Sequence, residues 1–230
     1  MSDQSTRKQN PQVISYLTLR KTVGILAILF PIIIIGGSLV SGECHEILGN
    51  LSTYYHTGMR NLFVGILSAI ALFLFAYNGY DRRDAIAGNI ACVLALLVAF
   101  FPTSVTEPLP PCILSAYENK ISSSIHFFSA GGFFLILAYF SIFLFTKKEP
   151  KPTRMKLKRN KLYRICGYII LGCILVMAVL FLLDNLSHGE LLKMYNPTIW
   201  LETVALWAFG ISWLVKGNVI LKDKHVSRES

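Results

Sequence analysis

The sequence predicts an all-α membrane protein, a bundle of six transmembrane helices with both the N and the C terminus in the cytoplasm. Hydrophobic residues make up 53% of the chain and charged residues only 15%. The apolar residues fall into six stretches, and basic residues gather on one side of them. A helix needs ~20 apolar residues to cross ~30 Å of hydrocarbon, and each stretch is close to that length. The expected helices span residues 23–40, 61–80, 85–102, 125–146, 165–183 and 199–215.

The positions of Lys and Arg predict the orientation of these helices. With both termini inside, all of the 22 Lys and Arg except Arg60, Lys120 and Lys193 lie on the cytoplasmic side, as the positive-inside rule requires. We therefore expect an integral protein of a bacterial inner (plasma) membrane. Its expected parts are a cytoplasmic tail (1–22), a transmembrane domain (23–216) that includes a basic cytoplasmic loop (147–164), and a second cytoplasmic tail (217–230).

The net charge of +9 follows from this topology. The basic loop between Lys147 and Arg164 is expected to lie on anionic lipid headgroups, to which each basic residue contributes up to ~1 kcal/mol. We expect membrane lipids as partners and no nucleic acid. The sequence has no zinc-finger spacing, Gly-rich phosphate loop or nucleophile elbow. It predicts no cofactor, and it leaves open the oligomeric state and whether a metal is bound.

The five cysteines fall into two groups. Cys92, Cys166 and Cys173 lie within predicted helices and are expected to be small packing residues. Cys44 and Cys112 lie in the first and second predicted external loops. If the external side is oxidising, these two could form a disulfide between the loops. Two free loop thiols are the alternative.

Ionisable residues occur near the outer ends of the second, fourth and sixth predicted helices: His56 and Arg60, His126, and Glu202. A charge in a membrane helix costs roughly 2.5–3.5 kcal/mol, so it usually faces the bundle and has a partner. We expect Arg60 and Glu202 to lie within ~4 Å of each other or to share one water. If the second helix begins early, Ser52 lies on one stripe with His56 and Arg60.

These residues predict a polar pocket that opens to the outer face. Its expected ligand-binding residues are Ser52, Tyr54, Tyr55, His56, Arg60, His126 and Glu202. The candidates for a catalytic role are His56, His126 and Glu202. A structural alternative stays open, because His and Tyr are common at membrane interfaces and an Arg–Glu pair can simply hold two helices together.

Several stretches resemble the bacterial relatives of the Frag/DRAM/Sfk superfamily of six-helix membrane proteins. They are LSTYYHTGMRNLFVGILSAIALFLFAYNGYDRRDAIAGNIACVLALLVAFFPTS, IHFFSAGGFFLILAYFSIFLF and WLETVALWAFGISWLVKG. The shared features are a polar motif before the second helix, a charged turn before an Ala/Gly-rich third helix, and an aromatic fourth helix that begins with His. Because eukaryotic members are linked to lipid and GPI-anchor processing or autophagy, the resemblance implies a function that involves lipids.

The spacing Ser52-x-x-x-His56 is also similar to a motif of the ceramidase and progestin-receptor-like membrane metal hydrolases. Those proteins have seven helices and a His-x-x-x-His motif in the last one. This chain has six predicted helices and offers only Glu202 there.

Three hypotheses for function follow. The first is a protein whose outward pocket binds or senses a lipid headgroup or another polar ligand, with Arg60 on an anionic group. The second is an intramembrane hydrolase of lipid esters or amides that uses His56, His126 and Glu202. The third is a small-solute transporter, against which stands the lack of an inverted repeat and of an acid in the middle of any helix.

Overall fold

The computed structural model describes residues 11–42, 44–77, 81–106, 108–113, 116–147, 152–187 and 196–221. These residues are helical for most of their length, which confirms the all-α prediction. The α-helices are α1 (Pro11–Val40), α2 (Arg60–Phe75), α3 (Arg82–Phe100), α4 (Lys120–Tyr139), α5 (Arg154–Ser187) and α7 (Pro197–Lys216). A 3₁₀-helix, η1 (Leu51–His56), precedes α2, and a π-helical turn, η2 (Phe140–Leu144), follows α4.

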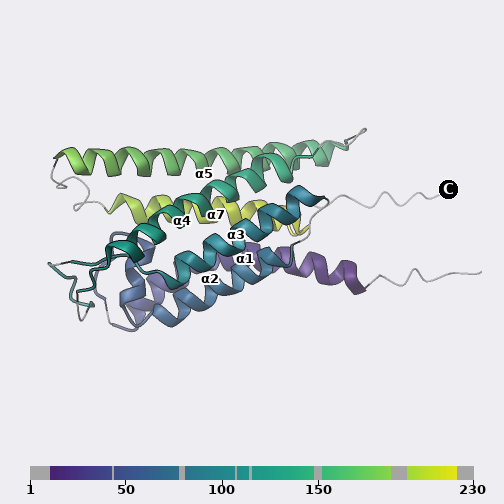
Figure 1. The fold of residues 1–230 in the computed structure, drawn as a ribbon. Coiled ribbons are helices and arrows are strands. Elements are labelled where there is room, and N and C mark those ends of the chain that lie inside the picture. Colours follow the sequence, from purple (N-terminus) through teal and green to yellow (C-terminus); the bar gives the residue numbers. More distant parts are fainter. Residues whose placement is uncertain are drawn as a thin grey trace, which may run out of the picture.

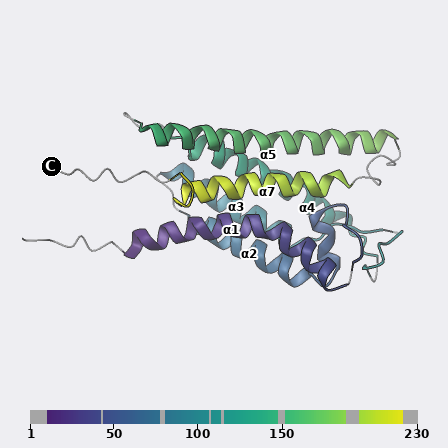
Figure 2. The same ribbon diagram turned by 180° about the vertical axis from the view of Figure 1, so that it is seen from behind.

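The helices run roughly side by side and form one bundle (Figures 1 and 2). Each of α1 to α5 packs against the next helix along the chain; α7 packs against both α5 and α1 and so closes the bundle. The described residues within 41–59 and 101–119 lie at one end, which we call the loop end. The opposite end, where α1 begins and α7 ends, is called the terminal end.

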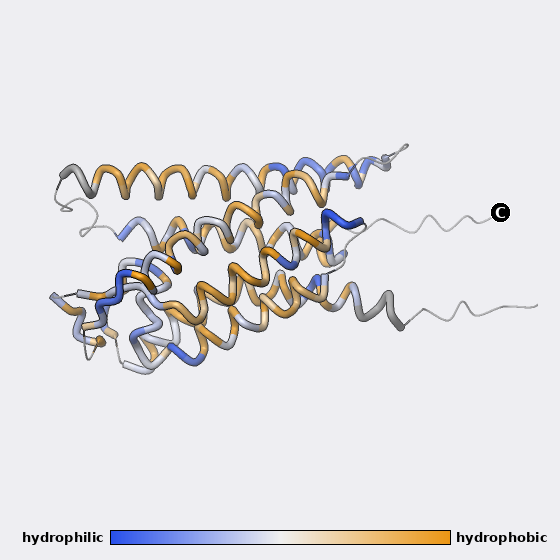
Figure 3. Tube along the Cα trace, in the orientation of Figure 1, coloured by the Kyte–Doolittle hydropathy of each residue, from blue (hydrophilic) through white to orange (hydrophobic). Residues whose placement is uncertain are grey.

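Five of the described helices are long and apolar enough to cross a membrane: α1, α3, α4, α5 and α7. Figure 3 shows hydrophobic residues along the middle of the bundle and hydrophilic residues toward its two ends. The shorter α2 has 16 residues, or about 24 Å. It ends before the predicted boundary at residue 80, because the N–H groups of Ala76 and Tyr77 bond back to the carbonyls of Leu72 and Leu74. Residues 78–80 lie outside the described part.

Two helices begin more than ten residues before their apolar stretches. The first was expected from residue 23 and begins at Pro11; the fifth was expected from residue 165 and begins at Arg154. Lys and Arg are good helix formers, so the basic segments continue the helices beyond the apolar stretch. With 34 residues, α5 is about 51 Å long.

Close packing of α2 on α3 determines where the segment after α3 emerges. The stripe Ala87, Ala91, Ala95 and Ala99 is buried on α3, as small residues at helix contacts in membranes usually are. At Gly88 a Cβ atom would lie 2.5 Å from the carbonyl oxygen of Leu74. The two backbones therefore touch here, and α3 delivers residues 100–104 beside the start of α2.

Candidate functional site

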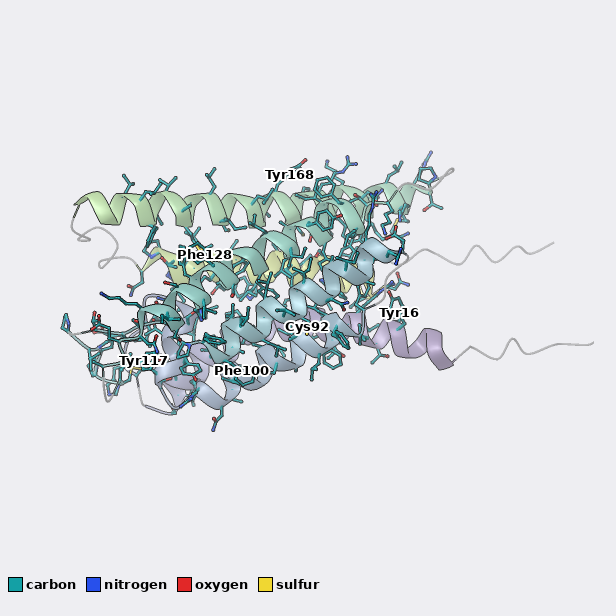
Figure 4. The ribbon with its side chains drawn as sticks, in the orientation of Figure 1. Tyr16, Cys92, Phe100, Tyr117, Phe128 and Tyr168 are labelled. Carbon is teal, nitrogen blue, oxygen red and sulfur yellow. A yellow bond between two sulfur atoms is a disulfide. The ribbon has the colours of Figure 1, made fainter. Side chains whose placement is uncertain are left out.

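A cavity of about 880 Å³ opens at the loop end, beside the start of α2. We call it the loop-end pocket. Its volume falls within the 300–1,000 Å³ that is typical of small-molecule sites. The described residues that line it are Tyr55, His56, Thr57, Gly58, Arg60, Phe100, Pro102, Pro111, Cys112, Ala116 and Tyr117. Figure 4 labels two of them at this end of the bundle, Phe100 at the end of α3 and Tyr117 in the following loop.

Two cross-links hold the walls of the pocket together. Val105 and Tyr117 exchange backbone hydrogen bonds of 2.8 and 2.9 Å, so the loop after α3 folds back on itself. Cys44 and Cys112 are joined by a disulfide. These are the two cysteines that the sequence placed in the first and second external loops. Since Cys112 lines the cavity, the disulfide fixes one wall of the pocket to the loop after α1.

Arg60 provides the formal positive charge among the described residues of the pocket. It is the first residue of α2 and is exposed. Its Nη2 donates a 2.8 Å hydrogen bond to the hydroxyl of Tyr55, and its guanidinium carbon lies 4.5 Å from the centre of the same ring. A guanidinium has five N–H donors, so these contacts leave donors for an anionic ligand while Tyr55 orients the group.

His56 closes the pocket on the side of the loop after α3. Its Nε2 lies 2.8 Å from the carbonyl oxygen of Thr103, and since a carbonyl only accepts, Nε2 carries the proton. The ring packs against those of Tyr55 and Tyr117, each with its centre 5.4 Å away. Burial lowers the pKa of His56, and the charge of Arg60 adds to this, although the Thr103 bond acts in the opposite direction. His56 is therefore a neutral donor near pH 7.

His126 is buried beside the pocket and does not line it. Its Nδ1 lies 2.7 Å from the carbonyl oxygen of Phe101, and its Nε2 lies 2.7 Å from Oγ of Ser52. It therefore links α4 both to the end of α3 and to η1. The sequence predicted that Ser52 and His126 line the pocket, but neither is among its lining residues.

Each of the first four residues after α3, residues 101–104, has a backbone group that bonds to a side chain. The carbonyl oxygen of Phe101 accepts from His126, and that of Thr103 accepts from His56, as described above. Ser122 Oγ donates to the carbonyl of Pro102 over 2.8 Å, and the N–H of Ser104 donates to Ser123 Oγ over 3.3 Å. A proline ends the helix and leaves carbonyls without helical partners. Polar residues at the end of η1 and in the first two turns of α4 supply those partners, so their first role is to shape the pocket wall.

Glu202 lies in the second turn of α7, and its Oε2 accepts a 2.7 Å hydrogen bond from the N–H of Leu51, the first residue of η1. Two further bonds join the same segments: Ile199 N–H to Gly49 O at 3.1 Å, and the side-chain amide of Asn196 to Ile47 O at 3.0 Å. Glu202 thus links the start of η1 to α7 through this hydrogen bond. It does not line the loop-end pocket.

The expected contact between Arg60 and Glu202 was wrong. Arg60 donates to Tyr55, Glu202 accepts from Leu51, and the ion pairs within the described part of the chain join other residues. Helix α2 packs on α1 and α3, whereas α7 packs on α1 and α5.

Two further details of the predicted pocket need correction. Ser52, His56 and Arg60 do not form one helical stripe, because η1 ends at His56, Thr57 is extended, and α2 begins only at Arg60. Tyr54, expected at the mouth, is fully buried, and its hydroxyl accepts the N–H of Leu48. Burial raises the pKa of the Tyr54 phenol, so it stays protonated.

One part of the pocket, formed by residues at and beyond the end of α3, was not predicted from the sequence. Phe100, Pro102 and Tyr117 line it, and all three lie at or beyond the end of α3. The available signal was Pro102, which marks a helix end and hence a segment whose free carbonyls need donors. Nothing in the sequence indicated that this segment would meet residues 55–60.

Within the described ranges, no three His, Cys, Asp or Glu side chains come together in a group that could hold a metal ion. No protein-family model, no curated protein and no solved structure matches the chain. Candidate functions therefore depend on the geometry of the loop end.

Proposed function

We propose that the chain is a multi-pass membrane protein whose loop-end pocket faces outward and binds the headgroup of an anionic lipid. The observation that carries this proposal is the lining of the cavity: one exposed guanidinium, neutral hydrogen-bonding rings, and an apolar wall. The outward direction rests on the positions of Lys and Arg in the sequence. With that orientation, the basic residues of the terminal end face the cytoplasm.

Two features favour a lipid over a small soluble anion. Phe100 is the last residue of the membrane helix α3, is 58% exposed and lines the pocket. The cavity therefore borders the region where acyl chains lie. Arg60 stands at the start of α2, at the level where the phosphate groups of the outer leaflet are expected. An amphiphile could place its phosphate on Arg60 while its chains extend along Phe100.

The test is binding of short-chain phosphatidylglycerol to the purified protein in a neutral detergent, with short-chain phosphatidylcholine as the zwitterionic comparison. Native mass spectrometry or intrinsic fluorescence gives the affinities. Replacing Arg60→Gln should weaken phosphatidylglycerol binding about tenfold or more, since a charge-assisted hydrogen bond contributes ~1.5–3 kcal/mol. Lys120→Gln is the matched control, because Lys120 is an exposed base at the loop end outside the described lining. Equal binding by wild type and Arg60→Gln, or no preference for the anionic lipid, would contradict the proposal.

A further inference from the structure

Ser52 and His126 form a hydroxyl–imidazole pair with an orienting group. The carbonyl oxygen of Phe101 can only accept, so Nδ1 of His126 carries the ring proton. That leaves the lone pair of Nε2 directed at Ser52 Oγ, 2.7 Å away. The hydroxyl therefore donates to the imidazole. A nucleophile, a base within hydrogen-bond reach and a third group that fixes the base are the arrangement of activated serine nucleophiles.

The surroundings of the pair suit this chemistry. His126 is only 3% exposed, so its ring is held away from solvent. Ser52 is partly exposed and lies one turn of the 3₁₀-helix before Tyr55, a lining residue of the loop-end pocket. Phe101, which orients His126, stands between Phe100 and Pro102, which also line the pocket. Ser52 therefore belongs to a segment that forms part of the pocket wall, and His126 on α4 bonds to the segment that forms another part of it.

We propose that Ser52 is a nucleophile for acyl transfer, with His126 as its general base and a carboxylic ester of a lipid as substrate. Oγ of Ser52 bonds to the ester carbonyl carbon as its proton moves to Nε2 of His126. The C–O bond of the ester then breaks, and the leaving alkoxide takes that proton as an alcohol. Water, deprotonated by the same nitrogen, releases the fatty acid from Ser52 and restores the hydroxyl.

The choice of a lipid ester rests on the proposed headgroup pocket, whereas the reactivity of Ser52 rests only on its contact with His126. A purely structural role predicts something different. In that case the bond ties η1 to α4, the hydroxyl is no more nucleophilic than any other serine, and no covalent adduct forms. The two roles are separated by a reagent that reports on nucleophilicity.

The experiment treats the purified full chain in detergent with an uncharged alkyl fluorophosphonate. The activated Oγ displaces fluoride and forms a P–O bond, and intact-mass and peptide analysis locate the adduct. We expect one phosphonyl group per chain on Ser52, no labelling of Ser52→Ala, and labelling of His126→Gln slowed about 10²-fold or more. Ser41→Ala is the matched control, because the Ser41 hydroxyl also donates to a backbone carbonyl, that of Ser38, and its loss should leave labelling unchanged.

Wild-type protein that is monodisperse and folded but acquires no adduct on Ser52 would overturn the proposal. Equal labelling rates in wild type and in folded His126→Gln would overturn it as well. If His126→Gln does not fold, the site of the adduct in wild type decides the question. Arg60→Gln should label normally while losing phosphatidylglycerol binding. This variant separates a failure of the nucleophile from a failure of the headgroup pocket.

Discussion

The two ends of the bundle satisfy their polar side chains in different ways. At the loop end, His56, His126 and Glu202 bond to backbone groups of neighbouring segments. At the terminal end, Arg20 and Arg159 also donate to backbone carbonyls, but charged side chains there pair with one another as well. Lys147 Nζ lies 2.5 Å from a carboxylate oxygen of Asp84 and 2.9 Å from one of Asp81. Side chains at one end shape loops, whereas those at the other end join helices.

The interiors of the two ends differ as well. Near the terminal end, Trp213 packs against the rings of Tyr77, Phe140 and Phe145, with centres 4.9 to 5.8 Å apart. Arg20 lies over Tyr16, 4.1 Å from the ring centre. Aromatic rings fill this end, while the loop end encloses a cavity. The comparison indicates that the terminal end stabilises the fold and that the loop end is where a ligand can enter.

The largest effect on stability is expected from breaking the ion pair of the terminal end. Asp84 is fully buried, so Lys147→Met should remove the cation that pairs with a buried carboxylate and lower the free energy of unfolding by about 3–5 kcal/mol. Titration with a denaturing detergent in mixed micelles measures this loss. Adding Asp84→Asn should restore much of the stability. Asp81→Asn serves as the control with a far smaller loss, because Asp81 is about half exposed. If Lys147→Met is as stable as wild type, the terminal end does not have the role assigned to it.

Removal of the disulfide tests how far the loop end contributes to stability. Replacing both Cys44 and Cys112 by Ser should cost about 2–4 kcal/mol, measured by the same titration. It should also weaken phosphatidylglycerol binding, because Cys112 forms part of the pocket wall. Cys166→Ala is the control: this cysteine is buried on α5, far along the chain from the loops, and its loss should leave binding unchanged. Unaltered binding by the double variant would show that the pocket keeps its shape without the cross-link.

Much of the fold could be predicted because membrane helices have a strong sequence signal. Each apolar stretch of about 20 residues coincides with a helix, although α1 and α5 begin well before their stretches and α2 ends before its own. Helix ends were less predictable. Asn196 is of a residue type that often caps a helix through its side chain, but it adopts φ 44° and its amide bonds to Ile47 instead. Tertiary contacts outweighed local capping there.

The candidate site was predicted only in part, because its chemistry depends on backbone groups that no side-chain pattern reveals. His56 and Arg60, both expected in one pocket, line the loop-end cavity. His126 and Glu202 were identified as unusual, but their partners are the carbonyl of Phe101 and the N–H of Leu51. At the terminal end, Asp84 directly follows two arginines in the sequence. Its partner Lys147 is 63 residues away in the sequence.

The smallest effect, and the one that distinguishes the ends by pH, concerns His56. Because its pKa in the folded protein is lowered from the ordinary 6.5, the unfolded chain binds more protons as the pH falls below about 7. Stability should therefore decrease through this range and be unaffected above it. His56→Gln keeps an N–H donor for Thr103 but does not titrate, so its loss of stability between pH 7 and 5 should be shallower. His45→Gln, at an exposed histidine, should follow wild type.

At the terminal end, the pKa of Asp81 is lowered from 3.8, chiefly by its hydrogen bond to Lys147, so its stabilising contribution is lost only at lower pH. Unfolding midpoints measured from pH 8 to 3 would resolve both ranges, and identical profiles for wild type and His56→Gln would contradict the assignment of the upper one.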